Sequence, residues 1–148
     1  MAKMMAEITA KLVGKKFKHN SSDPEVGLDC FTNVMEFLKM KGKEVNKGEK
    51  FKGFDIFNYE AIYGEDPHGT MELAVEYLST ILEEVKIGFE VAGDILAIRF
   101  RLTPSAPLGL AIDAGNGFLI IAVQDLDIKL VPKKHYRIIK AYRMVKES

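Results

Sequence analysis

The feature that most constrains the fold of this chain is a change of hydrophobic periodicity near Gly93. Before it, apolar residues recur at helical spacing in three stretches. After it, short segments rich in branched residues are separated by Gly, Pro and Asp, which is typical of strands. The turn Gly115-Asn116-Gly117 predicts a hairpin, because its central residues tolerate a positive φ. Helices followed by antiparallel strands indicate an α+β domain.

The expected elements follow from this division. Helices are predicted from Met5 to Gly14, from Asp29 as N-cap to Gly42, and from Met71 through Val85 to Gly88. Strands are predicted at 94–100, 109–115, 118–124, 127–131 and 136–145. We expect one domain over 1–148, with a helical half at about 3–88, an irregular insert at 43–70, and a β half of about five strands at 93–146. The second helix is expected to pack across the sheet.

Composition excludes several classes of protein. Lys+Arg and Asp+Glu both total 21, so the chain carries no overall charge for nucleic acid or acidic lipid. We therefore expect no nucleic-acid partner, and the segment KKHYRIIKAYRMVK is interpreted as a solvated sheet edge. No apolar run is long enough for a signal peptide or a membrane span, which predicts cytoplasmic synthesis without membrane association. Nothing in the residues indicates the oligomeric state.

The stretch DPEVGLDCFTN contains the only cysteine, Cys30, which cannot form an internal disulfide. Asp29 precedes it, so Cys30 falls in the first turn of the second predicted helix. A thiol there is either a small core residue or a nucleophile that the helix N-terminus favours as a thiolate. These two interpretations stay open on the residues alone.

Longer stretches carry a resemblance to a known family. The segment LVGKKFKHNSSDPEVGLDCFTNVMEFLKMKG resembles the opening of the NlpC-type cysteine peptidases, and its DPEVGLDC loop resembles the branch in phage and prophage tail proteins. The segments EVAGDILAIRF and GLAIDAGNGFLIIA resemble the family's later strands, so the likeness covers roughly residues 10–145. It implies a papain-like α+β fold without a cofactor, with Cys30 in the position of the nucleophile. The partners it implies are peptidoglycan stem peptides or other tail proteins.

The sequence departs from the family at the catalytic base. Counted without gaps from the Gly115-Asn116-Gly117 turn, the family's histidine position is Gly109 and its second polar position is Ile121. A shift of one or two residues replaces Gly109 by Leu108 or Pro107, and no histidine lies between 69 and 134. The family's aromatic hydroxyl before the cysteine loop is replaced by Phe17.

This loss affects both steps of amide hydrolysis. An ordinary thiol is only a few per cent ionised at neutral pH, and an imidazole normally takes its proton and later protonates the leaving amine. We therefore expect a catalytically impaired domain that serves as a structural or interaction component of a phage or prophage tail, and hence of the virion. The alternative is an active hydrolase of peptidoglycan stem peptides, with Cys30 as nucleophile and a non-standard base.

Other chemically active residues have simpler interpretations. His19 is a candidate substitute base in the loop before Cys30, His68 is predicted in a turn, and His135 is predicted to enter the last strand. With one cysteine and no two histidines at ligand spacing, no zinc site is predicted. Asp29 is expected to cap the second helix, and Asp94 is expected to fix a turn where a strand begins.

Overall fold

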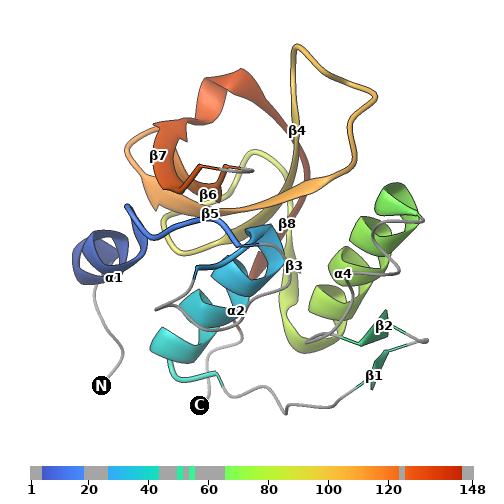
Figure 1. The fold of residues 1–148 in the computed structure, drawn as a ribbon, viewed down its shortest axis with the longest axis horizontal. Helices are drawn as coiled ribbons and strands as arrows, with labels where there is room; N and C mark the ends of the chain where they lie inside the picture. Colours follow the sequence, from blue (N-terminus) through green and yellow to red (C-terminus); the bar gives the residue numbers. More distant parts are fainter. Residues whose placement is uncertain are drawn as a thin grey trace.

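The structure, a computed structural model, describes residues 5–18, 27–43, 50–51, 54–55, 66–123 and 126–144. Its larger helices are α1 (Met5–Leu12), α2 (Cys30–Met40) and α4 (Pro67–Ile81). Figure 1 shows these helices together on one side of a sheet, with α2 between α1 and α4. The helices and the sheet thus form two layers, in agreement with the predicted α+β class.

The sheet contains six antiparallel strands among the described residues. They are β3 (Glu83–Val85), β4 (Ile95–Phe100), β5 (Gly109–Gly115), β6 (Phe118–Ala122), β7 (Ile128–Pro132) and β8 (Tyr136–Arg143). Their order across the sheet is β3-β8-β4-β5-β6-β7. Asn116 has a φ of 56° between β5 and β6, which confirms the predicted hairpin turn.

Alternation along the strands places apolar side chains on both faces of the sheet. The main core lies between the helices and the sheet and includes Ile8, Phe37, Leu78, Ile95, Leu110, Ile112 and Ile120. A smaller cluster covers the opposite face and consists of the buried residues Leu96, Ile98, Ala111, Leu119 and Ala141. We call these two sides the helix face and the outer face of the sheet.

The third helix differs from its prediction at both ends. It begins at Pro67, because Asp66 accepts a hydrogen bond from the Gly69 N–H at 3.0 Å and proline suits the first helical position. It ends at Ile81, since Leu82 is extended and Glu83–Val85 pair with β8 as strand β3. The helical half therefore contains a strand.

The predicted insert at 43–70 contains some regular structure. Strand β1 (Lys50–Phe51) pairs antiparallel with β2 (Phe54–Asp55), and the first turn of α4 lies at the end of the insert. Residues 44–49, 52–53 and 56–65 of the insert lie outside the described part of the chain.

The last strand is not a simple edge, contrary to the prediction. β8 lies between β3 and β4, but β3 pairs only with Ala141–Arg143. The first residues of β8 are therefore bonded to β4 alone among the described strands. A 3-10 turn, η1 (Lys133–His135), leads into β8.

An ion pair between Asp94, just before β4, and Arg143, at the end of β8, connects these two strands. The Asp94 carboxylate is buried, accepts from the Val91 N–H at 2.9 Å, and receives Arg143 Nε at 2.8 Å and Nη2 at 2.9 Å. This confirms that Asp94 fixes the turn before β4. Among the described residues, no helix is both long and apolar enough to cross a membrane.

Candidate functional site at Cys30

The start of α2 is held by reciprocal capping bonds. The Asp29 carboxylate accepts from the backbone N–H of Phe31 at 3.0 Å and of Thr32 at 2.9 Å. The Asp29 N–H in turn donates to Thr32 Oγ1 at 2.8 Å. This capping box confirms the predicted N-cap and fixes where the first turn of α2, and with it Cys30, lies.

The chain before Cys30 runs alongside the segment that contains Phe17. The Leu28 N–H donates to the Lys16 carbonyl at 2.9 Å, and the Lys18 N–H donates to the Leu28 carbonyl at 3.2 Å. Gly27 is required here, because its φ is +145° and a Cβ would lie 2.7 Å from the Lys16 oxygen. The structure thus places Phe17 in a bridge with Leu28, close in sequence to Cys30.

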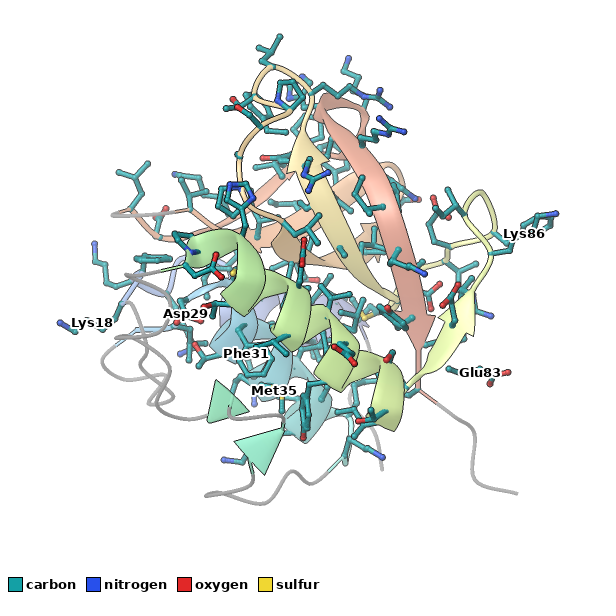
Figure 2. All side chains as sticks on the ribbon, turned by 90° about the vertical axis from the view of Figure 1, so that its right-hand side faces the viewer. Lys18, Asp29, Phe31, Met35, Glu83 and Lys86 are labelled. Carbon is teal, nitrogen blue, oxygen red and sulfur yellow. The ribbon has the colours of Figure 1, made fainter. Side chains whose placement is uncertain are left out.

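The second helix packs against a helix and against the sheet. Figure 2 shows α2 behind α4, with Asp29 near one end of α2 and Phe31 and Met35 along it. The ring of Phe31 meets that of Tyr77 on α4 edge-on, with centroids 6.4 Å apart. On its other side α2 contacts β5 and β6, which confirms the prediction that the cysteine helix packs across the sheet.

Cys30 is a partly buried residue packed against the main core. Burial raises the pKa of its thiol to about 12, and the charge of Asp29 contributes to the rise. Backbone N–H groups of Leu110, Phe31 and Cys30 act on the sulfur in the opposite direction. The thiol is therefore protonated at neutral pH, and no histidine of the described residues is among the groups that shift its pKa.

The side chains on β5 show which positions face the helices. Leu108, Leu110 and Ile112 belong to the main core, on the side of Cys30. A Cβ on Gly109 would instead lie 3.6 Å from Cγ1 of Ile98, on the outer face. Gly109, the family's histidine position by a gap-free count, therefore points away from Cys30.

A β-bulge lies on β5 between Gly109 and the hairpin turn. The pairing with β6 shifts register between Asp113 and Gly115, so one extra residue separates the hairpin turn from the strand. One extra residue exchanges the two faces of every position beyond it. In this chain the alternation beyond the bulge places Leu110 and Ile112 on the helix face and Gly109 on the outer face.

Ile121, which the gap-free count gives as the family's second polar position, also lies on the outer face. Ile121 packs against the outer cluster, whereas Ile120 and Ala122 pack on the helix face. The side chains on the helix face next to Gly109 and Ile121 are thus leucine, isoleucine and alanine, namely Leu110, Ile120 and Ala122. None of them can exchange a proton.

No histidine of the described residues is among the groups that act on the Cys30 thiol. His19 lies outside the described part of the chain. His68 is exposed in the first turn of α4 rather than in a turn, and His135 is exposed in η1 rather than in β8. Within the described ranges no three His, Cys, Asp or Glu residues are close enough to share a metal ion.

Asn33, one turn beyond Cys30, is a polar residue that the sequence analysis missed. It is fully buried in α2, and among the described residues neither its Nδ2 nor its Oδ1 has a hydrogen-bond partner. Such a group costs about 1–3 kcal/mol of stability. The only signal in the sequence was a single amide among the apolar residues of this helix.

Comparisons with known proteins agree with this architecture. One solved structure, the NlpC/p60 domain of the peptidoglycan hydrolase SagA, matches with a TM-score of 0.55 and 20% sequence identity. The match covers 96% of this chain and 100% of that domain. No family model and no curated protein matches the sequence. The chain therefore has the fold of an NlpC/p60 domain, as its sequence predicts.

Proposed function

We propose that this protein is a catalytically impaired NlpC-type domain that acts through binding, as a structural or interaction component of a phage or prophage tail. The observation that carries the impairment is the apolar surface opposite Cys30. Leu108, Leu110 and Ile120 occupy the helix face where a proton acceptor would be needed. The raised pKa of the Cys30 thiol, about 12, supports the same conclusion.

Support for the tail as the location comes from the sequence. The loop DPEVGLDC resembles that of the tail-protein branch of the family, and the strand motifs follow in the family's order. A domain that has the fold of a wall hydrolase, but no base beside Cys30 among its described residues, suits a role in protein binding. Its expected partners are other tail proteins.

An active hydrolase is the second candidate. Backbone N–H groups of Leu110, Phe31 and Cys30 act on the sulfur and could stabilise an oxyanion. The structurally similar domain belongs to a peptidoglycan hydrolase, so stem peptides of peptidoglycan are the substrate to test. His19 is the candidate base for this alternative.

The first test uses the only thiol of the chain. The rate of Cys30 alkylation by iodoacetamide, measured against pH, should show no ionisation below about pH 9, because burial raises the pKa of this thiol to about 12, well above the ordinary value near 8.5. A reactive pKa below about 7 would overturn the impaired site. His19→Ala would then show whether that histidine lowers the pKa.

A cleavage assay separates the two candidates directly. Purified protein should release no fragment from muropeptides, and Cys30→Ala should behave as the wild type does. Cleavage that is lost in Cys30→Ala would establish the hydrolase instead. The location is tested separately, by probing purified virions for the protein with an antibody, and its absence from them would contradict the tail role.

A further inference from the structure

A pocket of about 230 Å³ lies where β4 ends and β8 begins. None of its lining residues belongs to the first turn of α2, which contains Cys30. Its lining consists of Arg99, Phe100, Arg101, Pro104 and Arg137. Three arginines and no acidic residue therefore line one small hollow. Figure 2 shows nitrogen-tipped side chains gathered at this end of the sheet. A chain with no net charge thus has a concentrated positive site here.

These arginines lack acidic partners among the described residues. Arg143 on the same strand as Arg137 is paired with Asp94, but no described carboxylate forms an ion pair with Arg99, Arg101 or Arg137. Arg99 and Arg137 are also direct partners across β4 and β8. Like charges directly opposite each other destabilise a sheet, so an anion between them would offset a cost already present in the fold.

Two of the guanidinium groups are held in place by backbone. Arg99 Nε donates to the Ala106 carbonyl at 3.3 Å, and Arg101 Nε donates to the Lys134 carbonyl at 3.1 Å. Each group is fixed through its Nε, which leaves its two Nη atoms for another acceptor. Phe100 in the lining packs on Tyr136 with ring centroids 5.4 Å apart, which further restricts the pocket wall.

We propose that this arginine pocket binds a phosphate group. A planar guanidinium matches two oxygens of a phosphate, and three of them suit a dianion better than a single carboxylate. The volume is below that of pockets for whole drug-sized ligands, so the pocket takes a phosphate rather than a larger molecule. Its residues are half-buried or exposed, so the phosphate is either free or the end of a molecule that extends into solvent.

The pocket is connected to the cysteine site through one loop, although the phosphate proposal does not require a reactive Cys30. The loop after β4 carries Pro104 and Ala106 and continues into Leu108 and β5, whose Leu110 N–H acts on the cysteine sulfur. A phosphate held by Arg99 and Arg101 would bind at the base of that loop.

The test is an NMR titration of the intact chain at constant ionic strength. Inorganic phosphate and glycerol 3-phosphate are added separately, with succinate as the dicarboxylate comparison, and the backbone amide N–H signals of residues 99–103, 105–106 and 134–137 are followed. We expect saturable shifts with phosphate, and weaker or no binding of succinate. Saturation by both phosphate compounds assigns the site to a phosphomonoester, and saturation by inorganic phosphate alone assigns it to the free ion.

Variants connect the binding to the arginines. Arg137→Gln removes a guanidinium with no hydrogen bond to the described residues, so the fold should persist, and the dissociation constant for phosphate should rise at least tenfold. Lys11→Gln removes one positive charge from α1 and should leave the constant unchanged. Shifts that do not saturate, equal binding of succinate, or equal weakening in both variants would overturn the phosphate site.

Discussion

The single residues opposite Cys30 decide whether its thiol can ionise. On the helix face these residues are Leu110 on β5, which is buried in the main core, and Leu108 just before β5, which packs against that core. The nearby charge is that of Asp29, which raises the thiol pKa beyond the effect of burial. A base would therefore have to enter at one of the leucine positions, and the partly exposed Leu108 is the one that can accept it.

Leu108→His should partly restore a reactive thiol. An imidazole on the helix face would stabilise the thiolate, so the pKa of Cys30 should fall by more than one unit from about 12. The matched control is Gly109→His, because its Cβ points to Ile98 on the outer face and should leave the pKa unchanged. Alkylation rates against pH measure both variants, and a larger effect from Gly109→His would contradict the assignment of faces.

The stability of helix α2 depends on the capping of its first turn by Asp29. Asp29 is buried, and its carboxylate satisfies the N–H groups of Phe31 and Thr32. An unsatisfied helix N-terminus in this position would leave buried donors without partners. The cap therefore stabilises the helix while its charge disfavours a thiolate at Cys30.

Asp29→Ala and Asp29→Asn separate these two effects. Alanine removes the cap and should lower the free energy of unfolding by about 1–2 kcal/mol. Asparagine keeps an oxygen acceptor, so it should cost much less stability while lowering the pKa of Cys30 by removing the negative charge. Urea unfolding measures the first effect and alkylation the second. Equal destabilisation by both variants would show that the charge, and not the capping oxygen, stabilises α2.

In the whole molecule, buried charges connect segments that are distant in sequence. The Nζ atom of Lys133, just after β7, lies 3.0 Å from Oδ2 of Asp113 on β5. The same atom lies 3.2 Å from Oε1 of Glu90 in the loop before β4. Burial acts to raise the pKa of Glu90, but hydrogen bonds from its own backbone, from the Gly88 N–H and from Lys133 outweigh it and lower the pKa below 4.5. Glu90 therefore stabilises the fold when it is ionised.

The pH dependence of stability follows from that direction. A lowered pKa in the folded state gives stabilisation that is fully present above the unfolded value of 4.5 and is lost as pH falls through the folded value. The difference in unfolding free energy between the wild type and Glu90→Gln should thus be constant near neutral pH and shrink below about pH 4.5. Urea unfolding at a series of pH values measures it, and a difference that grows on acidification would contradict the bond network.

Local signals predicted most of the fold. The five strands of the β half, the Asn116 turn and the Asp29 cap each follow from neighbouring residues, and the structure contains all of them. Strand β3 was missed because Val85 continues the spacing of α4, although tertiary pairing with β8 makes it a strand. The direction of Gly109 depends on a bulge four residues away, and the arginine pocket depends on the register of β4 and β8. Neither can be read from local periodicity.

The position of β8 determines the order in which the sheet can form during synthesis. β8 is the last described strand in the sequence, yet it separates β3 from β4. On the ribosome, β3 has no partner among the described strands until the residues up to Arg143 have emerged, whereas β4 to β7 can pair in sequence order. A nascent chain that stalls before β8 would thus expose one edge of β4 to other nascent chains.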